Sequence, residues 1–64
     1  MKHRVVYMLE SVTDDGDLVY RLFAANKRTA EKIARNHANS PAPVIRKLSK
    51  SEQYWINPAD VDRL

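Results

Sequence analysis

The first half of the chain holds two runs that are rich in valine, tyrosine, leucine and phenylalanine, at positions 2–12 and 18–25. Between them lies Thr13-Asp14-Asp15-Gly16-Asp17, which contains the only glycine of the chain. Asp-Gly between two β-rich runs is a strong hairpin signal, because glycine adopts a positive φ at little cost. The pattern therefore predicts an antiparallel hairpin with Asp15 and Gly16 as its two loop residues.

This hairpin has a definite register. With Asp15 and Gly16 in the loop, the position numbers of opposed residues sum to 31, a consequence of antiparallel pairing. Glu10 then faces Arg21 as a cross-strand ion pair, and Met8 faces Phe23. A three-residue loop with a bulge would slip the pairing by one residue and separate these partners. The charge match favours the two-residue loop.

Helical spacing follows the hairpin. Asn26 is a suitable N-cap, and a segment with Pro41 and Pro43 ends the helix. The small and apolar positions of this segment form one stripe: Ala30, Ile33, Ala34, His37 and Ala38. An alanine-rich stripe predicts a helix that lies close against a sheet.

The remaining segments complete an α+β layout. The order predicted after the helix is a strand at Val44–Leu48, a polar turn at Ser49–Gln53, a short strand or extended segment at Tyr54–Ile56, and a helix from Asn57 to Leu64. We therefore expect residues 1–64 to form one small domain. Its antiparallel sheet would have the order of elements ββαβ, with a short fourth strand as an option. One main helix would cover the sheet, and a short helix would close the chain.

The predicted hairpin has apolar side chains on both faces. One face would carry Leu9, Leu18, Tyr20 and Leu22, and the other Val6, Met8, Val12, Val19 and Phe23. One helix cannot cover both faces, so either the C-terminal segment folds back over the second face or a partner covers it. The residues expected at a protein interface are Val6, Met8, Phe23, Tyr54 and Trp55. Alternation places Tyr54 and Trp55 on opposite sides, and Trp55 either covers the core or contacts a partner.

Chain length sharpens this expectation. A chain of 64 residues buries a small core, and the absence of cysteine excludes disulfides. Either the core is well packed, or the chain associates with a protein partner or with a second copy. No apolar run approaches the ~20 residues that span a bilayer, and cysteine-free composition fits a reducing compartment. We expect a cytoplasmic protein without a membrane segment.

The chain carries a net charge of +3, and its basic residues are grouped. The groups expected to bind nucleic acid or an acidic partner are Lys27, Arg28, Lys32 and Arg35 on the helix, and Arg46, Lys47 and Lys50 after it. The alternative interpretation of both groups is an ordinary solvated surface.

The sequence contains no motif for catalysis, a metal or a cofactor. It has no cysteine nucleophile, and its two histidines, His3 and His37, stand far apart in the chain. The acidic run before Gly16 lacks the twelfth-position glutamate of a calcium loop, because Ala25 stands there. A single glycine excludes a glycine-rich phosphate loop. We therefore expect a non-enzymatic protein without metal or cofactor.

Two resemblances to known protein families bear on the function. A hairpin that runs into Ala25-Asn26, then Ala30-x-x-x-Ala34 and one strand, resembles small phage-encoded inhibitors of bacterial machinery over positions 4–48. This resemblance implies a regulator that occludes a host protein of nucleic-acid metabolism or defence, without catalysis.

The second resemblance concerns the C-terminal segment. Residues 54–64, Tyr-Trp-Ile-Asn-Pro-Ala-Asp-Val-Asp-Arg-Leu, resemble the wing end and last helix of excisionase-type winged-helix DNA binders, and residues 29–34 resemble their first helix. This implies a small basic DNA- or RNA-binding protein. The sequence thus supports two hypotheses, a protein-interaction module and a nucleic-acid binder.

Overall fold

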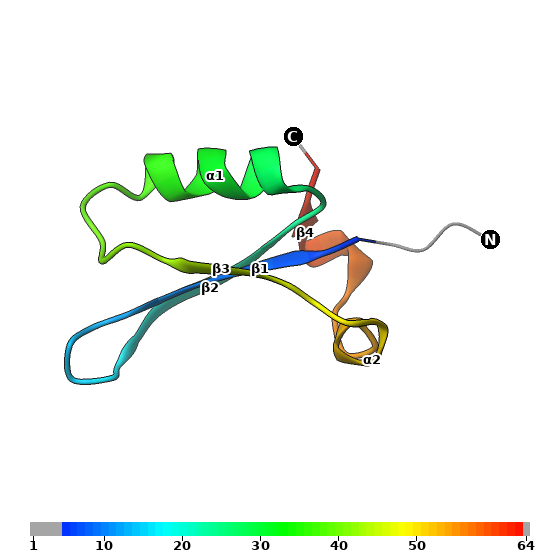
Figure 1. Ribbon diagram of the computed structural model, residues 1–64, viewed down its shortest axis with the longest axis horizontal. Coiled ribbons are helices and arrows are strands. Elements are labelled where there is room, and N and C mark those ends of the chain that lie inside the picture. The colour runs from blue at the N-terminus through cyan, green and yellow to red at the C-terminus, as the bar shows by residue number, and fades with distance from the viewer. Residues whose placement is uncertain (1–4, 64) are drawn as a thin grey trace.

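The computed structural model describes residues 5–63, and these form a four-stranded sheet with one main helix (Figure 1). The elements are β1 (Tyr7–Val12), β2 (Leu18–Ala24), α1 (Lys27–Asn36), β3 (Val44–Lys47), α2 (Lys50–Gln53), the 3₁₀ helix η1 (Pro58–Asp60) and β4 (Val61–Asp62). The strand order is β3-β1-β2-β4, with β2 and β4 parallel and the other pairs antiparallel. The predicted α+β class is confirmed, whereas the predictions for His3 and Leu64 lie outside the described residues.

Helix α1 covers one face of the sheet (Figure 1). Its N-cap is Asn26, as predicted, and the Asn26 Oδ1 atom accepts a hydrogen bond of 2.7 Å from the Thr29 N–H. Ala30 and Ile33 of the apolar stripe are buried against Leu9 and Ala24 of the hairpin. Small side chains at the contact allow helix and sheet to approach closely, so this face is closed over a compact cluster.

The buried hydroxyl of Ser11 links strand β1 to the loop that follows α1. Its Oγ atom donates a hydrogen bond of 2.7 Å to the carbonyl of Pro41, in the loop that returns from α1 to β3. At the same end, the His37 ring stacks on the Tyr20 ring with centroids 4.5 Å apart. His37 is the C-cap of α1, and apart from this ring contact it is exposed, as is Ala38, so the buried part of the predicted stripe ends before His37.

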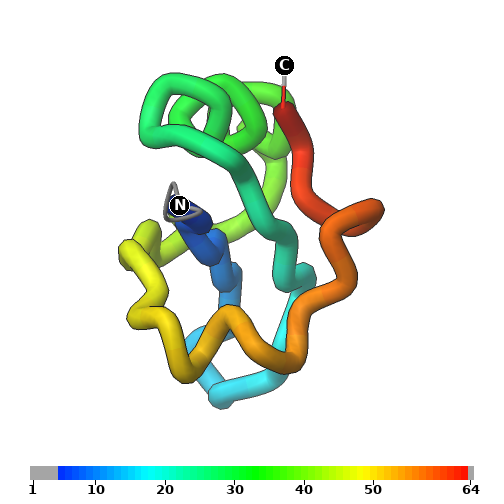
Figure 2. The backbone as a smooth tube through the Cα atoms, turned by 90° about the vertical axis from the view of Figure 1, so that its right-hand side faces the viewer, coloured from blue at the N-terminus to red at the C-terminus, as the bar shows by residue number. Residues whose placement is uncertain are grey.

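The C-terminal segment covers part of the other face. After β3, the chain crosses beneath the sheet to the opposite edge and joins β2 as β4 (Figure 2). Leu48 and Val61 bury Val6 in a second cluster, and Ile56 packs beside Met8 and Phe23. The sequence left open whether the tail or a partner covers this face, and the tail covers the half next to Val6.

The hairpin register is confirmed from Tyr7 to Ser11, but the loop prediction is wrong, and so is the expectation that a three-residue loop with a bulge would separate Glu10 from Arg21. Glu10 opposes Arg21 as predicted, whereas the loop has three residues, with Thr13 and Asp17 bonded across it. The longer loop shifts the pairing by one residue, and a bulge at Val19 shifts it back. The bulge also turns Leu18 to oppose Val12, so Leu18 shares the face of Val12 and not that of Tyr20.

Gly16 sits in this loop with φ of +89°, in the left-handed region. An added Cβ would meet no atom within 4 Å, so the cost of a side chain there comes from the backbone alone. We expect Gly16→Ala to lower the free energy of unfolding by about 1 kcal/mol. Thermal and urea unfolding measure this difference, and Asp15→Ala is the neighbouring control, expected to change stability by less than about 0.5 kcal/mol. Equal losses in both variants would contradict the backbone explanation.

The C-terminal segment differs from its prediction in three places. The predicted polar turn is the short helix α2, capped by Ser49 and Glu52 in a reciprocal capping box. Tyr54 is the αR C-cap of α2 and not part of an extended segment. Asn57 and Pro58 begin a helix as predicted, but it is a single 3₁₀ turn that ends at Asp60. The chain then continues as β4, in which Val61 and Asp62 pair with Phe23 and Ala24 at the edge of β2.

Candidate functional site

The sheet face opposite α1 remains uncovered towards the hairpin end. Val12, Leu18 and Val44 lie on this face, and their exposed fractions are 36%, 51% and 66%. The tail packs against the other half of the same face, around Val6. We call the uncovered half, together with Tyr54 and with Trp55, which lines a groove next to Met8 and Phe23 of the same sheet face, the open face.

Tyr54 and Trp55 are the most exposed large hydrophobic residues described, at 85% and 88%. Both lie in the turn that follows α2, and their rings meet edge to face with centroids 6.2 Å apart. The prediction that they point to opposite sides is wrong, because it assumed a strand at this position. Trp55 does not cover the core, so the structure leaves its ring in solvent.

A groove of about 280 Å³ lies beside Trp55 on the open face. Its apolar wall includes Met8, Phe23 and Ile56, all partly buried. The tail holds this wall in place, because Ile56 packs against the cluster around Val6. An exposed aromatic ring next to a preformed apolar groove is the arrangement that receives a side chain from a partner.

Two ion pairs border this groove. Arg21 Nε lies 2.8 Å from Glu10 Oε2, which confirms the cross-strand pair expected from the register. Arg46 Nη2 lies 2.8 Å from Glu52 Oε2, and Glu52 also accepts from the Ser49 N–H at 2.9 Å. Asp60 also lines the groove, so its border is polar with about one net negative charge.

The contacts of Glu52 hold the pKa of its carboxyl at about 2, from an ordinary value of 4.5. The largest cause is the hydrogen bond from Arg46, followed by those from Ser49. A depressed pKa means that the charged carboxylate stabilises the fold above pH 4.5, and that this stabilisation is lost as the pH falls towards 2. The capping of α2, and with it the position of Trp55, should weaken over this acid range.

We expect the side-chain carboxyl of Glu52 to titrate with a midpoint near 2, as measured by carbon NMR. Arg46→Ala removes the first cause and should raise the midpoint towards 4.5. Lys50→Ala changes a neighbouring cation that does not contact Glu52, and should leave the midpoint unchanged. A midpoint near 4.5 in the unmodified chain would show that the ion pair does not persist in solution.

The structure brings together four of the five residues predicted for a protein interface. Met8, Phe23 and Trp55 line the groove, and Tyr54 stands next to Trp55. Val6 is fully buried, so its side chain belongs to the core and has no surface to offer a partner. The sequence did not indicate Val44 and Ile56 for this surface, although the apolar character of both could have suggested them.

The two predicted basic groups do not form one surface. Lys27, Arg28, Lys32 and Arg35 are exposed on α1, and none of them makes an ion pair with any residue in the range 5–63. We call these four residues the basic stripe. Arg46 is instead held by Glu52 on the opposite side of the sheet, and Lys47, its neighbour in β3, faces the other way.

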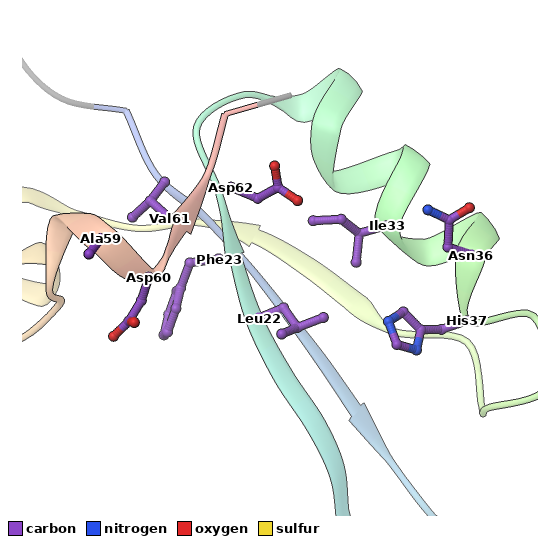
Figure 3. Close-up of a pocket in the computed structure, with 9 residues that line it drawn as sticks. All are labelled: Leu22, Phe23, Ile33, Asn36, His37, Ala59, Asp60, Val61 and Asp62. Carbon is purple, nitrogen blue, oxygen red and sulfur yellow. The ribbon is translucent and has the colours of Figure 1, made fainter.

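A second hollow, of about 410 Å³, lies at the outer side of β2 between α1 and the tail (Figure 3). Leu22 and Ile33 form its apolar part, with His37 at one end and Asp60 at the other. Within the described range, no three histidine or acidic side chains come close enough together to hold a metal ion. The same part of the chain includes no helix with the length and apolar character that crossing a membrane requires.

Comparisons with known proteins give no relative for this chain: no family model, curated protein or solved structure matches it. The resemblances to phage-encoded inhibitors and to excisionase-type DNA binders therefore stay predictions.

Proposed function

We propose that this chain is a non-enzymatic protein-interaction module that docks through its open face, with Trp55 as the anchor. In this role it acts as a small regulator or inhibitor that occupies a surface of a partner protein. A partner from nucleic-acid metabolism or defence fits the phage-inhibitor resemblance. The observation that supports the proposal most strongly is the 88% exposure of Trp55 beside an apolar groove.

The energetics of the open face favour docking. Burying an exposed tryptophan removes roughly 200 Å² from water, which is worth up to about 5 kcal/mol before association costs. The valine and leucine side chains at the hairpin end extend the apolar area on the same side. Tryptophan and tyrosine are also the residue types most often found at the energetic centre of interfaces.

The charges around the groove predict how such a complex responds to salt. Glu10 neutralises Arg21, and Glu52 neutralises Arg46, so the open face needs no strongly charged partner. Binding through it should therefore depend weakly on ionic strength, because few counterions are released.

A second function, nucleic-acid binding, is favoured by the basic stripe. Its four cations are exposed and have no acidic partner in the described part of the chain. If all four contact phosphates of duplex DNA, the logarithm of the association constant should fall with the logarithm of salt concentration with a slope of about −3.6. The stripe lies on α1, whereas the open face lies across the sheet from α1, so separate variants can test the two functions (Figure 1).

Two variants distinguish these functions. The tagged full chain is used to capture partners from the cells that express it, alongside Trp55→Ala and the double variant Arg28→Glu, Arg35→Glu, with quantitative mass spectrometry. An interaction module should lose its stoichiometric protein partner in the Trp55 variant and keep it in the double variant. The reverse pattern, with nucleic acid bound at low salt, would support the second function and contradict the first.

A further inference from the structure

Strand β2 has an outer edge with no strand beside it for most of its length. Strand β4 pairs only with Phe23 and Ala24, and within residues 5–63 nothing continues this pairing along Leu18–Leu22. Figure 3 shows Leu22 and Phe23 on opposite sides of β2 where β4 meets it. An open strand edge presents unpaired N–H and C=O groups at alternate positions, and another extended chain satisfies them best. We call the outer side of Leu18–Leu22 the β2 edge.

The opposite edge of the sheet is protected against such pairing. Strand β3 carries Arg46 and Lys47, and Pro41 and Pro43 precede it in the chain. Charged side chains and proline are the usual means by which native proteins block an edge. The β2 edge has one charged side chain, Arg21, which Glu10 neutralises, and one bulge at Val19, but it has neither lysine nor proline. The two edges therefore differ in how readily they accept a further strand.

The hollow of about 410 Å³ adjoins the β2 edge under α1. A strand added there would direct every second side chain towards α1, as strand geometry requires. The hollow lined by Leu22 and Ile33 would receive one of them (Figure 3). This arrangement combines backbone pairing with a side-chain pocket, which is how strand-addition sites gain affinity and specificity together.

Charge indicates which extended chain fits. Asp14, Asp15 and Asp17 lie at the hairpin end of the β2 edge, and Asp60 lies at the other end, beside Phe23. A second copy paired antiparallel along this edge would bring the acidic loop of one copy to the Asp60 end of the other, which is repulsive. A partner strand with lysine or arginine at both ends is attracted at both ends.

We propose that the β2 edge is a strand-addition site for an extended segment of a partner protein, with apolar side chains at alternate positions and basic residues at both ends. The proposal rests on the proposed function in that it requires a protein partner. The strand-addition site does not include Trp55, so an experiment can contradict this proposal or the proposed docking through Trp55 without contradicting the other.

The test selects peptides that bind the chain of 64 residues from a random heptapeptide library. Amide hydrogen exchange of the chain then shows where the selected peptides bind. We expect selected peptides to alternate apolar residues between basic ends, and to slow exchange within Leu18–Leu22 at least tenfold. Methylating the backbone nitrogens of the peptide that face β2 should abolish binding. Methylating the peptide nitrogens that face away from β2 should preserve it. The triple variant Asp15→Asn, Asp17→Asn, Asp60→Asn should bind about tenfold more weakly. Glu31→Gln, on the exposed side of α1, and Trp55→Ala should bind as the unmodified chain does.

Three results would overturn the proposal. One is a selection without binders, and another is a set of binders that protect α1 or the turn at Trp55 instead of the β2 edge. The third is concentration-dependent self-association that protects Leu18–Leu22, which would assign the edge to a second copy of this chain.

Discussion

Replacing Leu9 with alanine is expected to cost about 3 kcal/mol of the free energy of unfolding. Leu9 is fully buried in the centre of β1 and contacts the cluster of Ala24, Ala30 and Ile33. Alanine neighbours cannot move to fill the cavity, because the helix already lies close to the sheet. A domain of this size has roughly 3–10 kcal/mol in total, so the variant should unfold roughly 12–24 °C lower or not fold at all.

Leu18→Ala is the matched control for this prediction. It makes the same chemical change on the neighbouring strand, but Leu18 is 51% exposed on the open face. We expect it to cost less than about 1 kcal/mol in calorimetry or urea unfolding. Similar losses in the two variants would mean that the α1 side of the sheet does not hold the main core.

Replacing Trp55 with alanine should weaken binding of the partner by about 30-fold or more. This corresponds to at least about 2 kcal/mol, the usual threshold for a residue at the energetic centre of an interface. The substitution removes the largest exposed apolar side chain of the open face and one wall of the groove. Titration calorimetry with the recovered partner measures the loss of affinity. In a kinetic binding measurement, most of this loss should appear as a faster dissociation rate.

Two controls separate this effect from misfolding. Because Trp55 is 88% exposed, the same variant should change the free energy of unfolding by less than about 0.5 kcal/mol. Trp55→Phe keeps an aromatic ring at the position and should restore part of the affinity. A Trp55→Ala variant that binds its partner at full strength would place the interface elsewhere on the molecule.

The sequence predicted the N-terminal two thirds of the fold well because its signals there are local. Asn26 and the alanine stripe specify α1, and the ion pair of Glu10 and Arg21 specifies the strand register. The loop prediction failed because two shifts cancel, one from the extra loop residue and one from the bulge at Val19. Nothing in the composition of the strand marks Val19 as the bulged residue.

The C-terminal third was harder to predict because its structure depends on distant residues. The sequence of Ser49 and Glu52 contains a capping box, so α2 could have been recognised locally. Strand β4 could not, since Val61 and Asp62 become a strand only by pairing with Phe23 and Ala24. The residues of the candidate site differ in the same way. Met8 and Phe23 were predicted from alternation along their strands. The exposure of both Tyr54 and Trp55 depends on the turn after α2.

These observations explain why a chain this short has a free surface. Helix α1 closes one face of the sheet, and the tail is long enough to cover about half of the other before it joins β2. The tail also places the single tryptophan beside Met8 and Phe23 of the same sheet face. The tail residues that pack on Val6 therefore leave the rest of this sheet face uncovered.

The fluorescence of Trp55, the only tryptophan, tests the central claim most directly. At dilutions where the chain is monomeric by light scattering, its emission should match that of free tryptophan amide, and acrylamide should quench it almost as efficiently. Emission shifted to shorter wavelength, with strong protection from acrylamide in the monomer, would mean that Trp55 is buried. The open face would then have no anchor, and the proposed interaction would be contradicted.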